Sequence, residues 1–279
     1  MYKMICIDID GTLILPDLTM SDRVISAIKK AKEKGVMIVL STGRMFKSAL
    51  HYSDQLELND PIVSSNGAYV RSKENGEIYY EENLSSDDVK HIVEILDKHD
   101  EKINWYNHNT MFISQYREYV GRYEEMSKTL PENRRIKIQY LDEDYTIHNA
   151  LNDANHAIQK GIVFPNMEVI PVLREEFADF EQVKVVSSGP DNIEFTALGA
   201  DKGLGVLALA KAKGIKPEEI IAIGDSENDL AMLKVVGMPV AMGNAVDSVK
   251  EVAKYITDTN VNDGVAKMIE KFILQEEVL

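Results

Sequence analysis

Short apolar runs alternate with helical patterns of apolar residues at both ends of the chain. Each run spans four or five residues and predicts a buried strand; the runs cover residues 4–7, 36–40, 61–64, 220–223 and 239–242. Helices are expected between and after them, at residues 21–34, 46–56, 202–213, 228–235, 248–253 and 264–274. This alternation is typical of a parallel, doubly wound α/β sheet.

The middle of the chain follows a different pattern. Residues 78–82 and 105–114 alternate like half-exposed strands, and a helix starting at Ser85 or Ser86 separates them. Further strands are expected at residues 161–164, 183–188 and 192–196, the last two as a hairpin. We therefore predict an α+β insert with an antiparallel sheet.

The two patterns define the expected domains. A discontinuous core would comprise residues 1–82 and 197–279, and the insert residues 83–196. With 279 residues, the chain is long enough for two such domains.

Charge narrows the range of partners. The formal net charge of −15 argues against nucleic acid, whose recognition requires clustered Lys and Arg. A phosphorylated substrate would need a local positive focus such as a metal ion. The single cysteine, Cys6, lies in the first strand and is interpreted as a small buried hydrophobe. No secretory signal or membrane span is visible, so a cytoplasmic location without membrane contact is expected, and the sequence does not indicate the oligomeric state.

The first apolar run ends in two carboxylates. Asp8 and Asp10 follow the strand at residues 4–7, and Gly11 allows a sharp turn. Ligands of open α/β sheets bind outside the carboxyl ends of strands, where such a pair can share a divalent cation and supply a nucleophile. The alternative is that the two aspartates only cap a turn.

Polar residues follow other strands or begin helices in the same domain. Asp8 and Asp225 offer hard oxygen ligands suited to Mg²⁺. The Thr42 hydroxyl, with nearby backbone N–H groups, can bind phosphate, Lys202 supplies a point charge, and Asn228 can donate a hydrogen bond. Each has a simpler interpretation as a helix cap, a surface charge or a turn, but their joint occurrence around one acidic pair indicates phosphoryl transfer.

These residues form an ordered set of motifs: Asp8-x-Asp10-Gly11-Thr12-Leu13, Ser41-Thr42-Gly43-Arg44, Lys202-Gly203 and Gly224-Asp225-Ser226-x-Asn228-Asp229. The set resembles the four motifs of the haloacid dehalogenase superfamily. The late lysine, the Asn66-Gly67-Ala68 segment and the large insert are similar to its Cof-type sugar-phosphate phosphatase branch. The resemblance implies a Rossmann-like core, an inserted α+β cap and magnesium-dependent phosphatase activity.

The resemblance also implies a role for each motif residue. Asp8 would be the nucleophile that forms an aspartyl-phosphate. Asp10 would be the general acid and then base, which requires a pKa nearer neutrality, and would lend its backbone carbonyl to the metal. Asp225 would be the metal carboxylate with Ser226 nearby, and Asp229 would orient Lys202 or a metal-bound water. Phosphate would be held by Thr42, Gly43, Lys202, Asn228 and the backbone of Ile9. Arg44 is either structural or phosphate-facing.

The function expected from this set is hydrolysis of small phosphomonoesters, such as sugar phosphates or related metabolites. A phosphomutase and a non-catalytic metabolite sensor remain alternatives; intact Asp8 and Asp10 argue against the sensor. Four residues of the insert are candidates for substrate contact: Trp105, Tyr106, His108 and Phe112. The alternative for these four is that they form the core of the cap.

Overall fold

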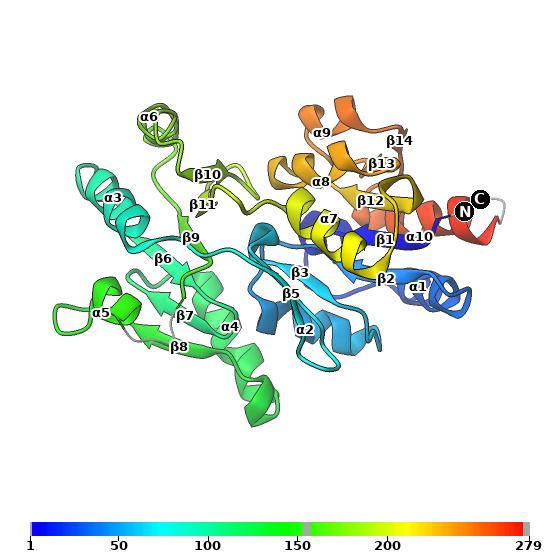
Figure 1. Cartoon of the computed structure of the whole chain (residues 1–279), viewed down its shortest axis with the longest axis horizontal. Coiled ribbons are helices and arrows are strands. Elements are labelled where there is room, and N and C mark those ends of the chain that lie inside the picture. The colour runs from blue at the N-terminus through cyan, green and yellow to red at the C-terminus, as the bar shows by residue number, and fades with distance from the viewer. Residues whose placement is uncertain (1, 153–156, 276–279) are drawn as a thin grey trace.

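The computed structural model describes residues 2–152 and 157–275, which form two lobes (Figure 1). One lobe is built on a five-stranded parallel sheet in the order β14-β13-β12-β1-β2. Its strands are β1 (Met4–Ile7), β2 (Met37–Leu40), β12 (Ile220–Gly224), β13 (Met238–Ala241) and β14 (Tyr255–Ile256). Met4 pairs with Met37 on one side and with Ile220 on the other, so β1 joins both ends of the chain.

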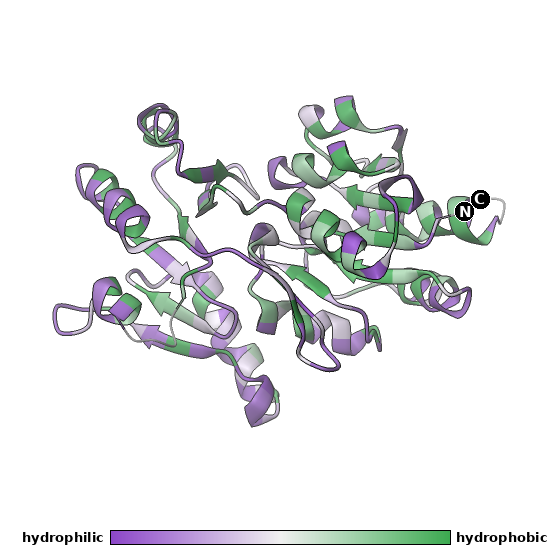
Figure 2. Cartoon of the chain, in the orientation of Figure 1, coloured by the Kyte–Doolittle hydropathy of each residue, from purple (hydrophilic) through white to green (hydrophobic). Residues whose placement is uncertain are grey.

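Helices complete this core. They are α1 (Asp22–Glu33), α2 (Phe46–Gln55), α7 (Lys202–Lys213), α8 (Leu230–Val235), α9 (Asp247–Val252) and α10 (Gly264–Ile269). α1 packs against α10, and α7 packs against α8. The strands between them are the most hydrophobic part of the molecule, as expected of a parallel sheet covered by helices (Figure 2).

Three predicted elements of the core differ in detail. The helix expected at residues 228–235 starts as a 3₁₀ turn at Glu227–Asp229 before α8, and a π-helical turn at Glu270–Leu274 follows α10. The third strand, β3 (Ile62–Ser64), lies beside β2 but joins the parallel sheet through an isolated bridge between Ser41 and Val63 rather than as a paired strand. It pairs antiparallel with β4 (Tyr69–Arg71), which pairs with β5 (Ile78–Glu81).

The second lobe is the cap. Its six-stranded sheet has the order β10-β11-β9-β6-β7-β8. The strands are β6 (Ile103–Tyr106), β7 (Thr110–Ile113), β8 (Lys137–Tyr140), β9 (Lys160–Val163), β10 (Val183–Val186) and β11 (Ile193–Ala197). The expectation of an antiparallel sheet is wrong for one pair, because β7 and β8 run parallel.

The expectation of one half-exposed strand at residues 105–114 is also wrong. The segment contributes to two strands, β6 and β7, and every residue of both is buried. Helices α3 (Ser86–Asp97), α5 (Ile147–Asn152) and α6 (Ile170–Glu176) pack on one face, and α4 (Glu118–Thr129) contributes to a separate apolar cluster. Alternation along β6 therefore separates two buried environments, with Trp105 in one and Tyr106 in the other.

The predicted fold class is confirmed: an α/β core with a parallel sheet, and a second α+β lobe. Helix α3 begins as predicted, with Ser85 as its N-cap and Asp88 completing a capping box. Within residues 2–152 and 157–275, no helix combines the length and the apolar character that crossing a bilayer requires.

Candidate active site

The carboxyl ends of β1, β2 and β12 bring the predicted polar residues together. The chain leaves β1 at Asp8, β2 at Ser41 and β12 at Asp225. Since β1 lies between the other two strands, these ends meet at the point where the strand order reverses, which is the usual ligand position in such sheets. The site therefore arises directly from the topology of the core.

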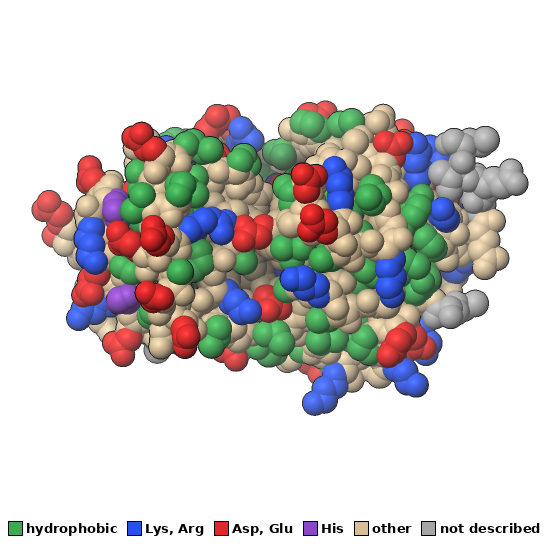
Figure 3. Space-filling view, turned by 90° about the horizontal axis from the view of Figure 1, so that it is seen from above, with side chains coloured by type: hydrophobic (Ala, Val, Ile, Leu, Met, Phe, Trp, Pro, Cys, Tyr) green, Lys and Arg blue, Asp and Glu red, His purple; other side chains and the backbone are tan. Residues whose placement is uncertain are grey.

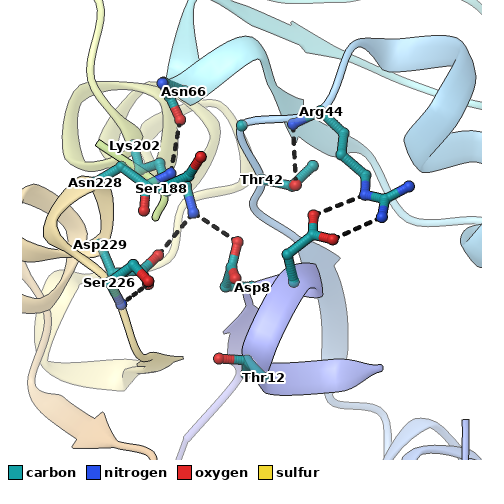
Figure 4. A network of polar contacts seen from close by, with 12 residues as sticks. Asp8, Thr12, Thr42, Arg44, Asn66, Ser188, Lys202, Ser226, Asn228 and Asp229 are labelled. Carbon is teal, nitrogen blue, oxygen red and sulfur yellow. Dashed lines mark hydrogen bonds and ion pairs between the residues drawn. The ribbon is translucent and has the colours of Figure 1, made fainter. Parts of the chain in front are cut away.

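Lys202 links two of the aspartates. It is the first residue of α7, whose N-cap is Asp201, and its side chain is fully buried. Its Nζ lies 2.6 Å from Asp8 Oδ1 and 2.7 Å from Asp229 Oδ1 (Figure 4). This geometry places Asp229 where it orients Lys202, one of the two positions expected for it.

The buried charges shift one another's pKa values. Burial raises the pKa of Asp8 well above its usual range; Lys202 opposes this shift, whereas Asp229, Asp225 and Asp10 add to it. Burial, with Asp229 beside it, raises the pKa of Asp225 to about 6. The positive charge of Lys202 thus does not offset the desolvation and mutual repulsion of Asp8 and Asp225. A further cation would stabilise the ionised forms of both carboxylates.

The donor set fits a hard divalent cation. Carboxylate oxygens of Asp8, Asp225 and Asp229 lie within 4.8 Å of one another. Asp229 is already engaged, because its Oδ1 accepts from Lys202 and its Oδ2 accepts from the backbone N–H groups of Asp225 and Ser226. Asp8 has an oxygen, Oδ2, that accepts no hydrogen bond among the described residues, and Asp225 accepts only from hydroxyl groups, which can rotate away. These two carboxylates are therefore better placed to hold the ion.

Three small residues, Gly11, Thr12 and Ser226, fix the orientation of the Asp225 carboxylate. Thr12 Oγ1 donates to its Oδ1 at 2.8 Å, and Ser226 Oγ donates to its Oδ2 at 3.0 Å. A Cβ at Gly11, which has a φ of +75°, would lie 2.5 Å from Asp225 Oδ2. Ser226 thus orients Asp225 here, and its predicted place in the metal site stays a prediction.

Asp10 is paired with Arg44. The guanidinium donates two hydrogen bonds, from Nε to Oδ2 at 2.7 Å and from Nη2 to Oδ1 at 2.6 Å. Desolvation raises the pKa of Asp10, but Arg44, together with Lys202 and Lys160, more than reverses this shift, so the pKa lies below its usual value. The expectation of a pKa nearer neutrality is therefore wrong for this conformation. Arg44 also lies over the rings of Tyr52 and Tyr123, at 5.0 and 6.0 Å from their centroids.

Two of the residues predicted to hold phosphate, Gly43 and Asn228, line the same cavity as Asp8. Asn228 donates to Asn66 Oδ1 at 3.0 Å, and Thr42 Oγ1 accepts from the Arg44 N–H at 3.1 Å. Helix α2 has Met45 as its N-cap, so the idea that Ser41 or Thr42 caps this helix is wrong. A Cβ at Gly43 would lie 2.8 Å from Asn66 Oδ1, so the loop is closely packed at this point.

A cap-derived network that the sequence did not reveal closes over these residues. Glu194 Oε2 accepts from Asn66 Nδ2 at 2.5 Å, and its Oε1 accepts from Lys160 Nζ at 3.0 Å and Ser188 Oγ at 2.7 Å. Lys160 also donates to the Gly43 carbonyl at 2.6 Å. Glu194 and Lys160 are both buried. The available signal was Glu194 between two apolar residues of the strand predicted at 192–196, and Lys160 immediately before the strand predicted at 161–164.

Residues of the cap and the core, Asp8 and Asp10 among them, line a partly open cavity of about 440 Å³. Figure 3 shows that the seam between the lobes is hollowed. Its wall is rich in aromatic and sulfur-containing side chains: Met45, Tyr52, Tyr106, Tyr119, Tyr123, Met126 and Phe164. Of the four candidates for substrate contact, Tyr106 lines this cavity. Trp105 and Phe112 lie in the cap core, and His108 lies at a second pocket.

Comparison with known proteins identifies the family. Residues 5–269 match the model for haloacid dehalogenase-like hydrolases, and the chain belongs to this family. It is 33% identical over 272 residues to the 5-amino-6-(5-phospho-D-ribitylamino)uracil phosphatase YcsE of Bacillus subtilis, covering 98% of this chain and 96% of that protein. The resemblance drawn from the motifs is confirmed, and the chain is an enzyme of the phosphatase class.

Solved structures agree on the fold. A haloacid dehalogenase-like hydrolase from Bacteroides thetaiotaomicron is 30% identical with a TM-score of 0.80, over 98% of this chain and 100% of that one. A sugar phosphatase of subclass IIB, 24% identical, has a TM-score of 0.80 over 97% and 98% of the two chains and shares the fold.

Proposed function

We propose that this enzyme hydrolyses phosphomonoesters of small metabolites, with Asp8 as nucleophile and Mg²⁺ as its cation. The observation that carries the proposal is the Lys202 bridge between Asp8 and Asp229, with Asp8 lining a partly open cavity between cap and core. Lys202 occupies Asp8 Oδ1, and among the described residues no hydrogen bond reaches Oδ2. Asp8 is thus held in place with one oxygen free to attack.

The first half-reaction transfers phosphate to the enzyme. Asp8 Oδ2 would bond to phosphorus while the bond from phosphorus to the leaving oxygen breaks, giving an aspartyl-phosphate. Asp10 would supply the proton that the leaving oxygen takes up. Asp8, Asp225 and the Asp10 backbone carbonyl would hold Mg²⁺, which when bound offsets the charge of the phosphate. Lys202, Thr42, Gly43, Asn228 and the Ile9 backbone would bind the phosphate oxygens.

The second half-reaction releases phosphate. Water would attack phosphorus, the bond to Asp8 would break, and Asp10 would accept the proton of the water at its carboxylate. Asp10 paired with Arg44 is ionised, which suits this basic role. To act as the acid of the first half-reaction, Asp10 must separate from Arg44 and take up a proton from solvent. Arg44 is therefore a positioning residue for the change of Asp10 between its acidic and basic roles.

The substrate is proposed by size and charge. A cavity of about 440 Å³ accommodates a metabolite but no folded partner. The tyrosines that line it offer flat apolar faces, and the named substrate of the Bacillus subtilis relative carries a uracil ring. Ring-bearing phosphomonoesters therefore belong in the test panel beside sugar phosphates. The phosphomutase alternative is tested by adding a sugar bisphosphate and following isomer interconversion.

The test is phosphate release from such a panel, with Mg²⁺ and after its removal by a chelator. Asp8→Asn should lower kcat by about 10⁴-fold, because an amide in place of the carboxylate cannot form the aspartyl-phosphate. Asp179→Asn, an exposed cap substitution of the same type, serves as the matched control and should retain activity. Turnover that survives in Asp8→Asn, or that needs no divalent cation, would refute the proposal; no turnover by the wild type would favour the metabolite sensor.

A further inference from the structure

A second pocket lies where the cap meets the core, and it shares no lining residue with the active-site cavity. Its volume is about 190 Å³. The core contributes the start of α2 and the β4–β5 turn; the cap contributes the β6–β7 turn and the 3₁₀ turn Glu132–Arg134. The two sides are in contact, because the Lys47 N–H donates to the His108 carbonyl at 3.1 Å.

The lining of this pocket is basic. Five of its side chains carry or can take up positive charge: Lys47, Arg71, Lys73, His108 and Arg134. Among the described residues, no acidic side chain lines it. The whole chain has 46 acidic residues against 31 lysines and arginines. A pocket whose charged side chains are all basic is therefore not expected from the composition. We call these five residues the basic pocket.

Only part of this charge is compensated. Lys73 and Arg134 both pair with Asp54, at 2.7 and 3.5 Å. Lys47 Nζ instead donates to the Arg135 carbonyl at 2.6 Å, and Arg71 Nε donates to the Gly76 carbonyl at 3.2 Å. Within residues 2–152 and 157–275, neither Lys47 nor Arg71 forms an ion pair, so neutral acceptors hold both side chains.

The neighbouring cationic groups lower the pKa values of Lys47 and His108. Burial lowers the pKa of Lys47, and Lys137 and Arg134 lower it further. Burial also lowers the pKa of His108, with Arg71, Lys47 and Lys137 adding to the shift and Glu81 opposing it. His108 lies flat against Tyr69, with ring centroids 5.2 Å apart. These groups would all be stabilised by a bound negative charge.

We propose that the basic pocket binds a small phosphate-type dianion. An arginine guanidinium and a lysine ammonium are the usual partners of phosphate, and Arg71 and Lys47 supply both. Among the described residues these two donate to carbonyl groups and to the Tyr69 hydroxyl rather than to a carboxylate. Because Lys47 and Arg71 belong to the core whereas His108 and Arg134 belong to the cap, one anion would contact both lobes. Its binding energy would favour the arrangement of cap and core seen here, in which both lobes reach the anion. Binding at this pocket would thereby be coupled to turnover at the active site.

The first test measures binding and needs no catalysis, so it stands even if the proposed phosphatase chemistry fails. Inorganic phosphate is titrated calorimetrically into the wild type, Lys47→Gln/Arg71→Gln and Asn228→Ala. We expect the double variant to lose one phosphate equivalent that Asn228→Ala retains. Lys90→Gln/Lys128→Gln removes two exposed cap lysines with the same change in charge and should bind like the wild type. Equal binding by all four proteins would overturn the proposal, as would equal losses in both double variants.

Two further arms define the ligand and its effect. Methylphosphonate carries the same head group on carbon; its binding to the basic pocket would indicate a phosphorylated metabolite, and its exclusion would indicate free phosphate. At saturating substrate, phosphate in the active site leaves kcat unchanged, whereas phosphate in the basic pocket should change kcat by about fivefold. The same kcat response in Lys47→Gln/Arg71→Gln would overturn the coupling.

Discussion

At the scale of single residues, the least expected feature is a buried ion pair of the cap whose two members also bond to the core. Lys160 and Glu194 bond to each other, and they also bond to Gly43 and Asn66 of the core. The bonds of Glu194 to Asn66 and of Asn66 to Asn228 form a continuous chain into the proposed phosphate site. The position of the cap is therefore coupled to the residues around Asp8.

Glu194→Gln should lower the free energy of unfolding by about 3 kcal/mol, because it leaves the Lys160 ammonium buried without its counter-charge. Urea unfolding is the measurement, and Glu181→Gln, at an exposed position of the same lobe, is the control. Glu194→Gln/Lys160→Met, which removes both charges, should recover part of the loss. A single variant that unfolds like the control would contradict this account.

Arg44→Gln should shift the acidic limb of the pH profile of kcat. Burial raises the pKa of Asp10 and Arg44 lowers it, so removing the guanidinium must raise that pKa. If ionised Asp10 accepts the proton of the attacking water, the acidic limb should move upward by about one pH unit. Arg122→Gln is the control, because Arg122 lines the same cavity but pairs with Glu118. An unmoved limb would mean that another group sets it.

At the scale of elements, the turn that joins β3 to β4 packs against the start of α7. Ser65, Asn66 and Gly67 lie between β3 and β4 with φ values of +50°, +54° and +89°. A Cβ at Gly67 would overlap the carbonyl of Asp201, the N-cap of the helix that begins with Lys202. The close approach of this turn to α7 therefore helps to place the buried lysine.

Gly67→Ala tests this contact against Gly35→Ala. Gly35 has a φ of +79°, and no atom lies within 4 Å of the position that its Cβ would take, so its substitution carries only the backbone cost of about 1 kcal/mol. Gly67→Ala carries the same backbone cost and adds the steric overlap, so we expect a further loss of about 2 kcal/mol. The comparison is made by urea unfolding, and equal losses in the two variants would exclude the overlap.

The sequence predicted best what depends on neighbours along the chain. Parallel strands end at one edge of a sheet, so Asp8, Thr42 and Asp225 could be placed together from apolar runs alone. The pairing of Asp10 with Arg44 joins two loops of the core, and that of Lys160 with Glu194 joins the neighbouring cap strands β9 and β11. Both pairs bring together residues far apart in the sequence, and the further bonds of Lys160 to Gly43 and of Glu194 to Asn66 depend on how the two lobes meet. No local pattern encodes these contacts. The strand β8 was not predicted, because its residues are mostly exposed and form no apolar run. Its parallel pairing with β7 is likewise a long-range contact without a local sequence signal.

At the scale of the whole molecule, the cap covers the nucleophile. The cavity above Asp8 lies between the lobes, and only a small molecule fits within it. We therefore expect a phosphorylated protein to be hydrolysed at least about 10³-fold more slowly than a small substrate at equal phosphate concentration. Phosphate release from both kinds of substrate is the measurement. Comparable rates would show that the cap opens far enough to admit a protein surface.

The pairing of β1 with β12 has a consequence for biosynthesis. β1 is an interior strand of the core sheet and is translated before the other strands of that sheet, yet its neighbour β12 follows more than 200 residues later, whereas the six strands of the cap lie within residues 103–197. On the ribosome, the cap can assemble while β1, with four consecutive buried apolar residues, still lacks that partner. We therefore expect the exposed amino-terminal strand to be the segment of the nascent chain most in need of chaperone protection.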